Sequence, residues 1–165
     1  MGVATHRRAE TVRRIASSFD EIEGQFSPDG QWLAYASNES GRYEIYVRSF
    51  PEAGEKRQVS ASGGMQPRWR GDGHELFYVA PDGRLMAVPI SLARGTPALE
   101  ARPPVPLLRL ASGANLATAG FQARPQYAVA RDGRFLMLIN SNEALMSPIT
   151  IVQNWQAALA PRERR

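Results

Sequence analysis

The chain has 165 residues, 43% of them hydrophobic, which is enough for a folded core, and it has no cysteine, which excludes disulfides, thiolate catalysis and cysteine-ligated zinc. Its formal net charge is +4, but residues 1–18 contribute +3 and residues 160–165 contribute +2, which leaves −1 for the rest of the chain. Because the excess lies at the two ends, solvated tails explain it better than a nucleic-acid surface, and we expect no nucleic-acid partner.

Residues 1–18 form a basic N-terminal segment without an apolar run of signal-peptide length. No export signal is visible, the compartment stays undetermined, and we expect no membrane insertion. The pattern of residues 10–19 is compatible with a short helix or with an outer strand of a sheet. We favour the strand, because a lone helix would have nothing to pack on.

A repeat organises the middle of the chain. A turn closed by Asp-Gly precedes an alternating apolar strand three times, before residues 31–36, 74–79 and 134–139. The first two copies are 43 residues apart and the third follows 60 residues later, after an insertion. Four-stranded propeller blades repeat every 40–50 residues or so, and the spacing therefore predicts blades. When the copies are aligned on the glycine, its third successor is a leucine in all of them, namely Leu33, Leu76 and Leu136.

The Asp-Gly pairs are interpreted as structural turns, because glycine supplies the positive φ that a tight hairpin needs. A fourth such pair follows Pro81. Each acid stands alone before its glycine, without the repeated acidic ligands of a calcium loop, so no metal site is predicted. The turn residues are Asp29, Gly30, Asp72, Gly73, Asp82, Gly83, Asp132 and Gly133.

Blade one is predicted over residues 19–60, with strands at 23–26, 31–37, 43–50 and 56–60. Blade two is predicted over residues 61–111. Its strands are expected at 65–70, 75–79, 85–90 and 105–110, and a Pro-rich loop at 92–106 precedes the last of them.

Blade three is predicted over residues 112–159, with strands at 126–130, 134–139 and 148–155, and a short basic tail follows at 160–165. This blade lacks its own outer strand. Something else has to complete it, since an unpaired strand edge invites aggregation.

These residues resemble a known family. The stretches Gln25-Phe-Ser-Pro-Asp-Gly-Gln-Trp-Leu-Ala-Tyr, Ser40-Gly-Arg-Tyr-Glu-Ile-Tyr-Val-Arg and Gly64-Met-Gln-Pro-Arg-Trp-Arg look like the TolB-like, WD-repeat-like β-propellers of bacteria. The resemblance covers residues 19–159. It implies an all-β propeller in which about three four-stranded antiparallel blades form half, or a fragment, of a six-bladed ring. Such propellers are often extracytoplasmic parts of bacterial Ser/Thr kinases or of regulators.

No enzyme motif accompanies the blades. The Gly-rich loop and the catalytic and metal-binding Asp residues of kinases are missing, the only lysine, Lys56, is in a loop context, and the hydrolase Gly-x-Ser-x-Gly elbow is absent. We interpret His74 as a polar turn residue, and Trp32, Trp69 and Trp155 as packing between blades. We therefore expect no catalytic, cofactor-binding or metal-binding residue and no cofactor.

Two functions remain open. The chain is either a non-catalytic interaction or scaffold module that binds a protein or peptide, or a sensor or substrate-gating part of a larger enzyme, a kinase or a prolyl-oligopeptidase-like peptidase. The missing outer strand also suggests a homodimer. Two chains would complete a six-bladed ring if the N-terminal strand of each joined the last blade of its partner.

Overall fold

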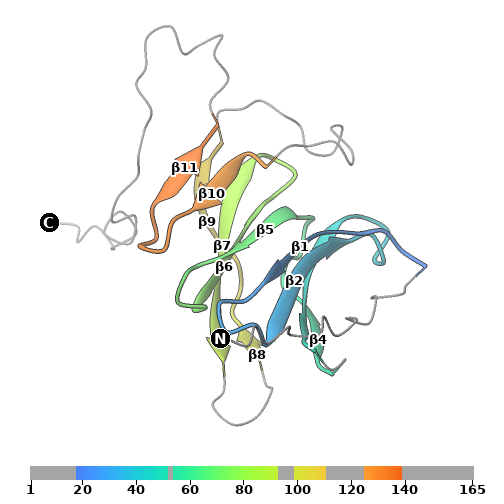
Figure 1. Cartoon of the computed structure of the whole chain (residues 1–165). Helices are drawn as coiled ribbons and strands as arrows, with labels where there is room; N and C mark the ends of the chain where they lie inside the picture. The colour runs from blue at the N-terminus through green and yellow to red at the C-terminus, as the bar shows by residue number, and fades with distance from the viewer. Residues whose placement is uncertain (1–17, 52–53, 93–98, 111–124, 139–165) are drawn as a thin grey trace, which may run out of the picture.

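The computed structural model describes residues 18–51, 54–92, 99–110 and 125–138, and every regular element in these ranges is a β-strand (Figure 1). All of the paired strands are antiparallel. The predicted all-β fold is therefore confirmed. The predicted N-terminal strand, the strand at 148–155, Trp155 and the basic tail lie outside the described residues.

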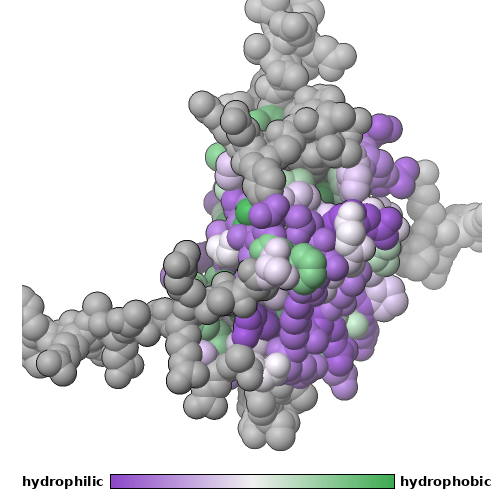
Figure 2. All heavy atoms as spheres, turned by 90° about the vertical axis from the view of Figure 1, so that its right-hand side faces the viewer, coloured by the Kyte–Doolittle hydropathy of each residue, from purple (hydrophilic) through white to green (hydrophobic). Residues whose placement is uncertain are grey.

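Blade one is a four-stranded meander in which each strand pairs with the next along the chain. Its strands lie close to the predicted positions: β1 (Glu21–Phe26), β2 (Trp32–Ser37), β3 (Glu44–Ser49) and β4 (Lys56–Gln58). All three residues of the outer strand β4 are exposed. Seen from the side of this blade, the described surface is largely hydrophilic with scattered apolar patches (Figure 2).

Blade two contains five strands instead of four. They are β5 (Met65–Trp69), β6 (Glu75–Val79), β7 (Arg84–Leu92), β8 (Leu99–Ala101) and β9 (Val105–Arg109). The first half of β7 pairs with β9, as expected for the outer strand, and the second half pairs with β8.

The segment 92–106, predicted as a Pro-rich loop, thus contains the strand β8. Leu99 explains the difference, because this side chain is buried in the same core as residues of blade one. In addition, its backbone N–H donates to Oε2 of Glu55, at 3.2 Å, in the loop before β4. One buried leucine between prolines is thus enough to hold a short strand against the core. The Pro-rich composition of the segment gives no sign of that strand in the sequence.

Blade three is described through β10 (Tyr127–Val129) and β11 (Phe135–Met137). Val129 faces Phe135 in their ladder, at the position where Trp69 faces Leu76 in blade two. Phe135, and not Leu136, is therefore the structural equivalent of Leu76. Aligning the repeats on the turn glycine therefore misplaces the strand of blade three by one residue. The reason is that its turn, closed between Ala130 and Arg134, is one residue shorter than the turn of blade two, closed between Arg70 and Glu75.

One face of blade two packs on blade one. Trp69, Leu76 and Tyr78 belong to one buried cluster with residues of β2 and β3. The indole Nε1 of Trp69 also donates to the backbone carbonyl of Gln25, at 3.1 Å. The expectation that this tryptophan packs between blades is met, and Trp32 lies in the same cluster.

The other face of blade two packs on blade three. Successive side chains of a strand point to opposite faces, so Phe77 and Val79 point away from blade one. They share a second buried cluster with Tyr127 and Phe135. The rings of Phe77 and Phe135 meet edge to face, with centroids 4.9 Å apart. The blades therefore stack face to face, with β5 between β10 and β1 (Figure 1).

Candidate functional site

The four Asp-Gly turns have one geometry. Each glycine has a φ between 71° and 83°, and its N–H donates to the carbonyl three residues earlier, at 2.9–3.0 Å. Each aspartate accepts, at 3.0–3.2 Å, a hydrogen bond from the N–H two residues further on. These carboxylates therefore serve their own turns. The turns are those of Asp29-Gly30, Asp72-Gly73, Asp82-Gly83 and Asp132-Gly133.

The turns do not assemble a chemical site. Those of blades two and three touch, since a Cβ at Gly71 would lie 3.1 Å from Cα of Arg131, but the turn at Asp82 lies at the other end of β6. The N–H and guanidinium of Arg134 hold the pKa of Asp132 below its usual value. Within the described ranges, no three His, Asp or Glu residues gather in a way that could hold a metal ion.

The opposite end of the blades is hollowed. The β2–β3 loop, the connector from β4 to β5 and the β6–β7 turn enclose two adjoining hollows of about 590 and 470 Å³. Gly63 and Pro81 line both of them. Tyr43 and Met65 line the larger hollow, and Tyr78, Met86 and prolines 104 and 106 line the smaller. Largely apolar walls with a few polar groups are what ligand sites usually have.

Two glycines set the shape of these hollows. Gly63 has a φ of 93°, and a Cβ there would lie 2.5 Å from Cγ of Pro81. A Cβ at Gly64 would lie 2.8 Å from both Ile45 and the ring of Tyr78. Only glycine lets the connector pass this closely between the two blades.

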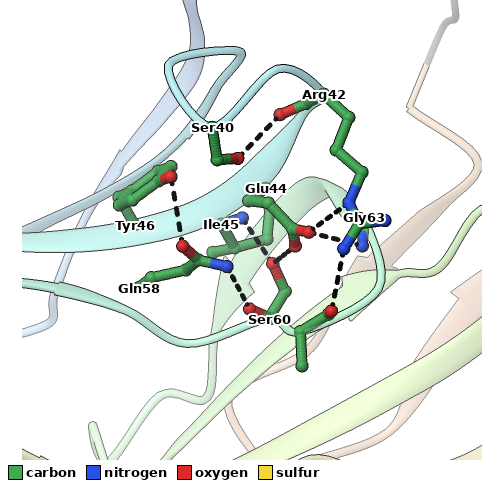
Figure 3. A network of polar contacts seen from close by, with 9 residues as sticks. Ser40, Arg42, Glu44, Ile45, Tyr46, Gln58, Ser60 and Gly63 are labelled. Carbon is green, nitrogen blue, oxygen red and sulfur yellow. Dashed lines mark hydrogen bonds and ion pairs between the residues drawn. The ribbon is translucent and has the colours of Figure 1, made fainter.

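A buried carboxylate holds the connector in place (Figure 3). Oε1 of Glu44 accepts hydrogen bonds from the N–H of Gly63, at 2.9 Å, and from Nε of Arg42, at 2.7 Å. Its Oε2 accepts from the hydroxyl of Ser60, which itself accepts from the N–H of Ile45 at 2.7 Å. The Glu44 side chain is 1% exposed, so these donors replace the water that the charge has lost. We interpret the network as a staple between blade one and the connector.

Tyr78 supplies a polar group to the smaller hollow. Its side chain lines the hollow, the residue is 3% exposed, and its hydroxyl has no hydrogen-bond partner among the described residues. Burial, and then the carboxylates of Glu44 and Asp82, raises the pKa of Tyr78 to about 12. The hydroxyl of Tyr78 is therefore protonated at neutral pH and can donate a hydrogen bond. The carboxylates of Glu44 and Asp82 disfavour a further negative charge beside it.

His74 and Lys56, the other two residues considered in the sequence, lie in positions that suit a structural role. His74 is exposed, and its N–H donates to Asp72 at 3.0 Å, which is the arrangement of a turn residue. Lys56, which we expected in a loop, is the first residue of β4. It pairs with Glu39 on the surface and lies 4.9 Å from the ring centroid of Tyr46. Neither residue lines the hollows.

The stacked antiparallel sheets are blades of a β-propeller. No family model matches the sequence, and no curated protein matches it. Among solved structures, oligogalacturonate lyase from Vibrio parahaemolyticus is similar at 16% identity and a TM-score of 0.37, over 68% of this chain and 27% of the lyase. This chain therefore spans little more than a quarter of that protein, and a likeness at this level carries no argument about activity. The described part of the chain contains no helix capable of crossing a membrane.

Proposed function

We propose that this chain is a non-catalytic, TolB-like propeller module that binds an extended segment of polypeptide in the hollows beside Gly63 and Pro81. The observation that carries the proposal is the position of Tyr78, a residue 3% exposed whose side chain lines the smaller hollow and whose hydroxyl makes no hydrogen bond to a described residue. A ligand acceptor bound in the hollow would accept a hydrogen bond from this hydroxyl among largely apolar walls.

The chemistry of the hollow favours a neutral ligand with carbonyl groups. Its walls include Met86 and three prolines, which suit apolar side chains of a bound segment. At the edge of this hollow, the carboxylate of Asp82 forms an ion pair of 3.4 Å with Arg84. These two charges neutralise each other, so neither of them requires a charged ligand. A peptide backbone offers regularly spaced carbonyls between side chains, and a few placed polar groups with apolar pockets are how proteins read such chains.

The test is to select peptides from a random library on the full chain and to measure the affinity of the best one by calorimetry. Tyr78→Phe keeps the ring and removes the donor, and we expect it to weaken binding by a factor of about 2–10, the value of one neutral hydrogen bond. Tyr46→Phe is the matched control, because its hydroxyl bonds Gln58 on blade one, away from the hollows, and its affinity should be unchanged.

The proposal is wrong if no peptide is selected, or if the selected peptide binds Tyr78→Phe as tightly as the parent chain. A peptide that loses affinity equally in both variants would also contradict it. Turnover of the bound peptide would contradict the non-catalytic role.

A further inference from the structure

A row of three residues crosses blade two beside the smaller hollow. Tyr78 on β6 lies opposite Met86 on β7, and Met86 lies opposite Pro106 on β9. Directly opposed residues of antiparallel strands share one face of a sheet, and all three of these residues line the hollow. Exposure increases along the row, from the buried Tyr78 through the half-buried Met86 to the exposed Pro106. The row is therefore an apolar wall that leads from the interior of the hollow to the surface.

The connector from β4 to β5 forms another wall, through residues 61–63. Its polar backbone groups already have partners, because the carbonyl of Ala61 accepts from Arg42 at 3.0 Å and the N–H of Gly63 donates to Glu44 at 2.9 Å. A ligand that had to pair its backbone with this wall, as an added β-strand does, would find these groups occupied.

The spacing of the row selects a conformation for the ligand. Neighbouring strands lie about 4.8 Å apart, which places Tyr78 and Pro106 about 10 Å from each other across β7. A polyproline II helix has three residues per turn and rises about 3.1 Å per residue, so its residues i and i+3 recur about every 9 Å on one side. A β-strand recurs on one side about every 7 Å. The row therefore matches a polyproline II segment that crosses the strands.

The hydrogen-bonding groups of the row favour the same ligand. A backbone N–H of the ligand would meet the side chains of Met86 and Pro106, which offer a weak acceptor and none. Proline has no N–H, and a polyproline II segment leaves its carbonyls free because it has no internal hydrogen bonds. Such a carbonyl can accept from the hydroxyl of Tyr78. The charged residues that line this hollow, Asp82 and Arg84, pair with each other, which suits an uncharged segment.

We propose that the segment bound in the hollows is proline-rich and adopts the polyproline II conformation, with two prolines three residues apart along the row from Tyr78 to Pro106. This inference rests on the proposed function and specifies its ligand. The chain itself already packs prolines here, since Pro104 and Pro106 line the same hollow. A bound proline-rich segment would continue that packing toward Tyr78.

Two fluorescently labelled peptides of equal length and composition test the spacing. Both are built from alanine and glutamine with two prolines, which are three residues apart in one peptide and two residues apart in the other. Fluorescence anisotropy with the full chain measures both affinities. We expect the three-residue spacing to bind about ten times more tightly, because the other spacing leaves one proline ring outside the row.

A variant of the row tests the place of binding. Pro106→Glu puts a charge at the outer end of the row and should weaken binding of the peptide with the three-residue spacing by a factor of about 10. Pro103→Glu is the matched control, because Pro103 is an exposed proline of the same segment that lines neither hollow, and its affinity should equal that of the parent chain. Circular dichroism and urea midpoints verify that both variants fold.

Equal affinities of the two peptides for the parent chain would overturn the inference, and so would equal losses in the two variants. A library peptide that contains no proline but depends on Tyr78 would overturn it as well, while the proposed function would stand. If no peptide of any composition binds, the proposed function and this inference both fail.

Discussion

The hydroxyl of Tyr127 donates a hydrogen bond of 2.7 Å to the backbone carbonyl of Gln66, across the interface between blades three and two. Gln66 is fully buried and lies where the ladder between β5 and β6 shifts register, so water does not reach its carbonyl. Burial strongly raises the pKa of the Tyr127 hydroxyl, which therefore remains a donor at neutral pH. The bond ties a side chain of one blade to the backbone of the next.

Tyr127→Phe should lower the free energy of unfolding by about 0.5–1.5 kcal/mol, because it removes a buried hydrogen bond between blades two and three. Urea denaturation followed by circular dichroism measures the loss. Tyr46→Phe is the comparison, since its hydroxyl makes a longer and only partly buried bond of 3.2 Å to Gln58. If both variants lost the same free energy of unfolding, the buried bond from Tyr127 to Gln66 would stabilise the chain no more than the partly buried bond from Tyr46 to Gln58.

The turns and strands were predictable because their signals are local. Asp29 followed by Gly30 predicts a hairpin from two adjacent residues, and the turn then fixes the register of the strands around it. The predicted strands of blade one lie within about two residues of β1 to β4 for the same reason.

The details that shape the hollows were not predictable, because they depend on residues far apart in the chain. Glu44 lies in an alternating strand, and nothing in that pattern shows that Gly63 will pass over it and enclose its carboxylate. Nor does the sequence show that the side chain of Tyr78 will line the smaller hollow. The pair Gly63-Gly64 was the one available signal, since two glycines between blades suggest a close passage of the backbone.

Gly63→Ala should destabilise the chain more than Gly83→Ala. Both glycines have positive φ, which costs an alanine about 1–2 kcal/mol. A Cβ at Gly83 meets nothing within 4 Å, whereas at Gly63 it would overlap Pro81 and add about 1–3 kcal/mol. Urea midpoints of the two variants give the comparison, and an equal loss would contradict the close passage of the connector.

Glu44→Ala should cost about 3 kcal/mol or more, since it removes the acceptor of Gly63, Ser60 and Arg42 together. Arg42→Ala should cost on the order of 1 kcal/mol, because the arginine side chain is 61% exposed and two donors to the carboxylate remain. Thermal or urea unfolding ranks the two variants. The reverse order would show that the network depends on the ion pair and not on the bonds to the connector.

The stability of the chain should fall as the pH rises above the ordinary pKa of tyrosine. In the folded chain the pKa of Tyr78 is raised from 10 to about 12, so between these values the folded state keeps a proton that the unfolded state has lost. The contribution is complete below pH 10 and is lost as the pH approaches 12, with a slope of up to about 1.4 kcal/mol per pH unit for this residue. Urea titrations between pH 9 and pH 12, or thereabouts, would measure it. Tyr78→Phe should make the decline shallower by that amount, and an unchanged slope would mean that the hydroxyl of Tyr78 ionises as easily in the folded chain as in the unfolded one.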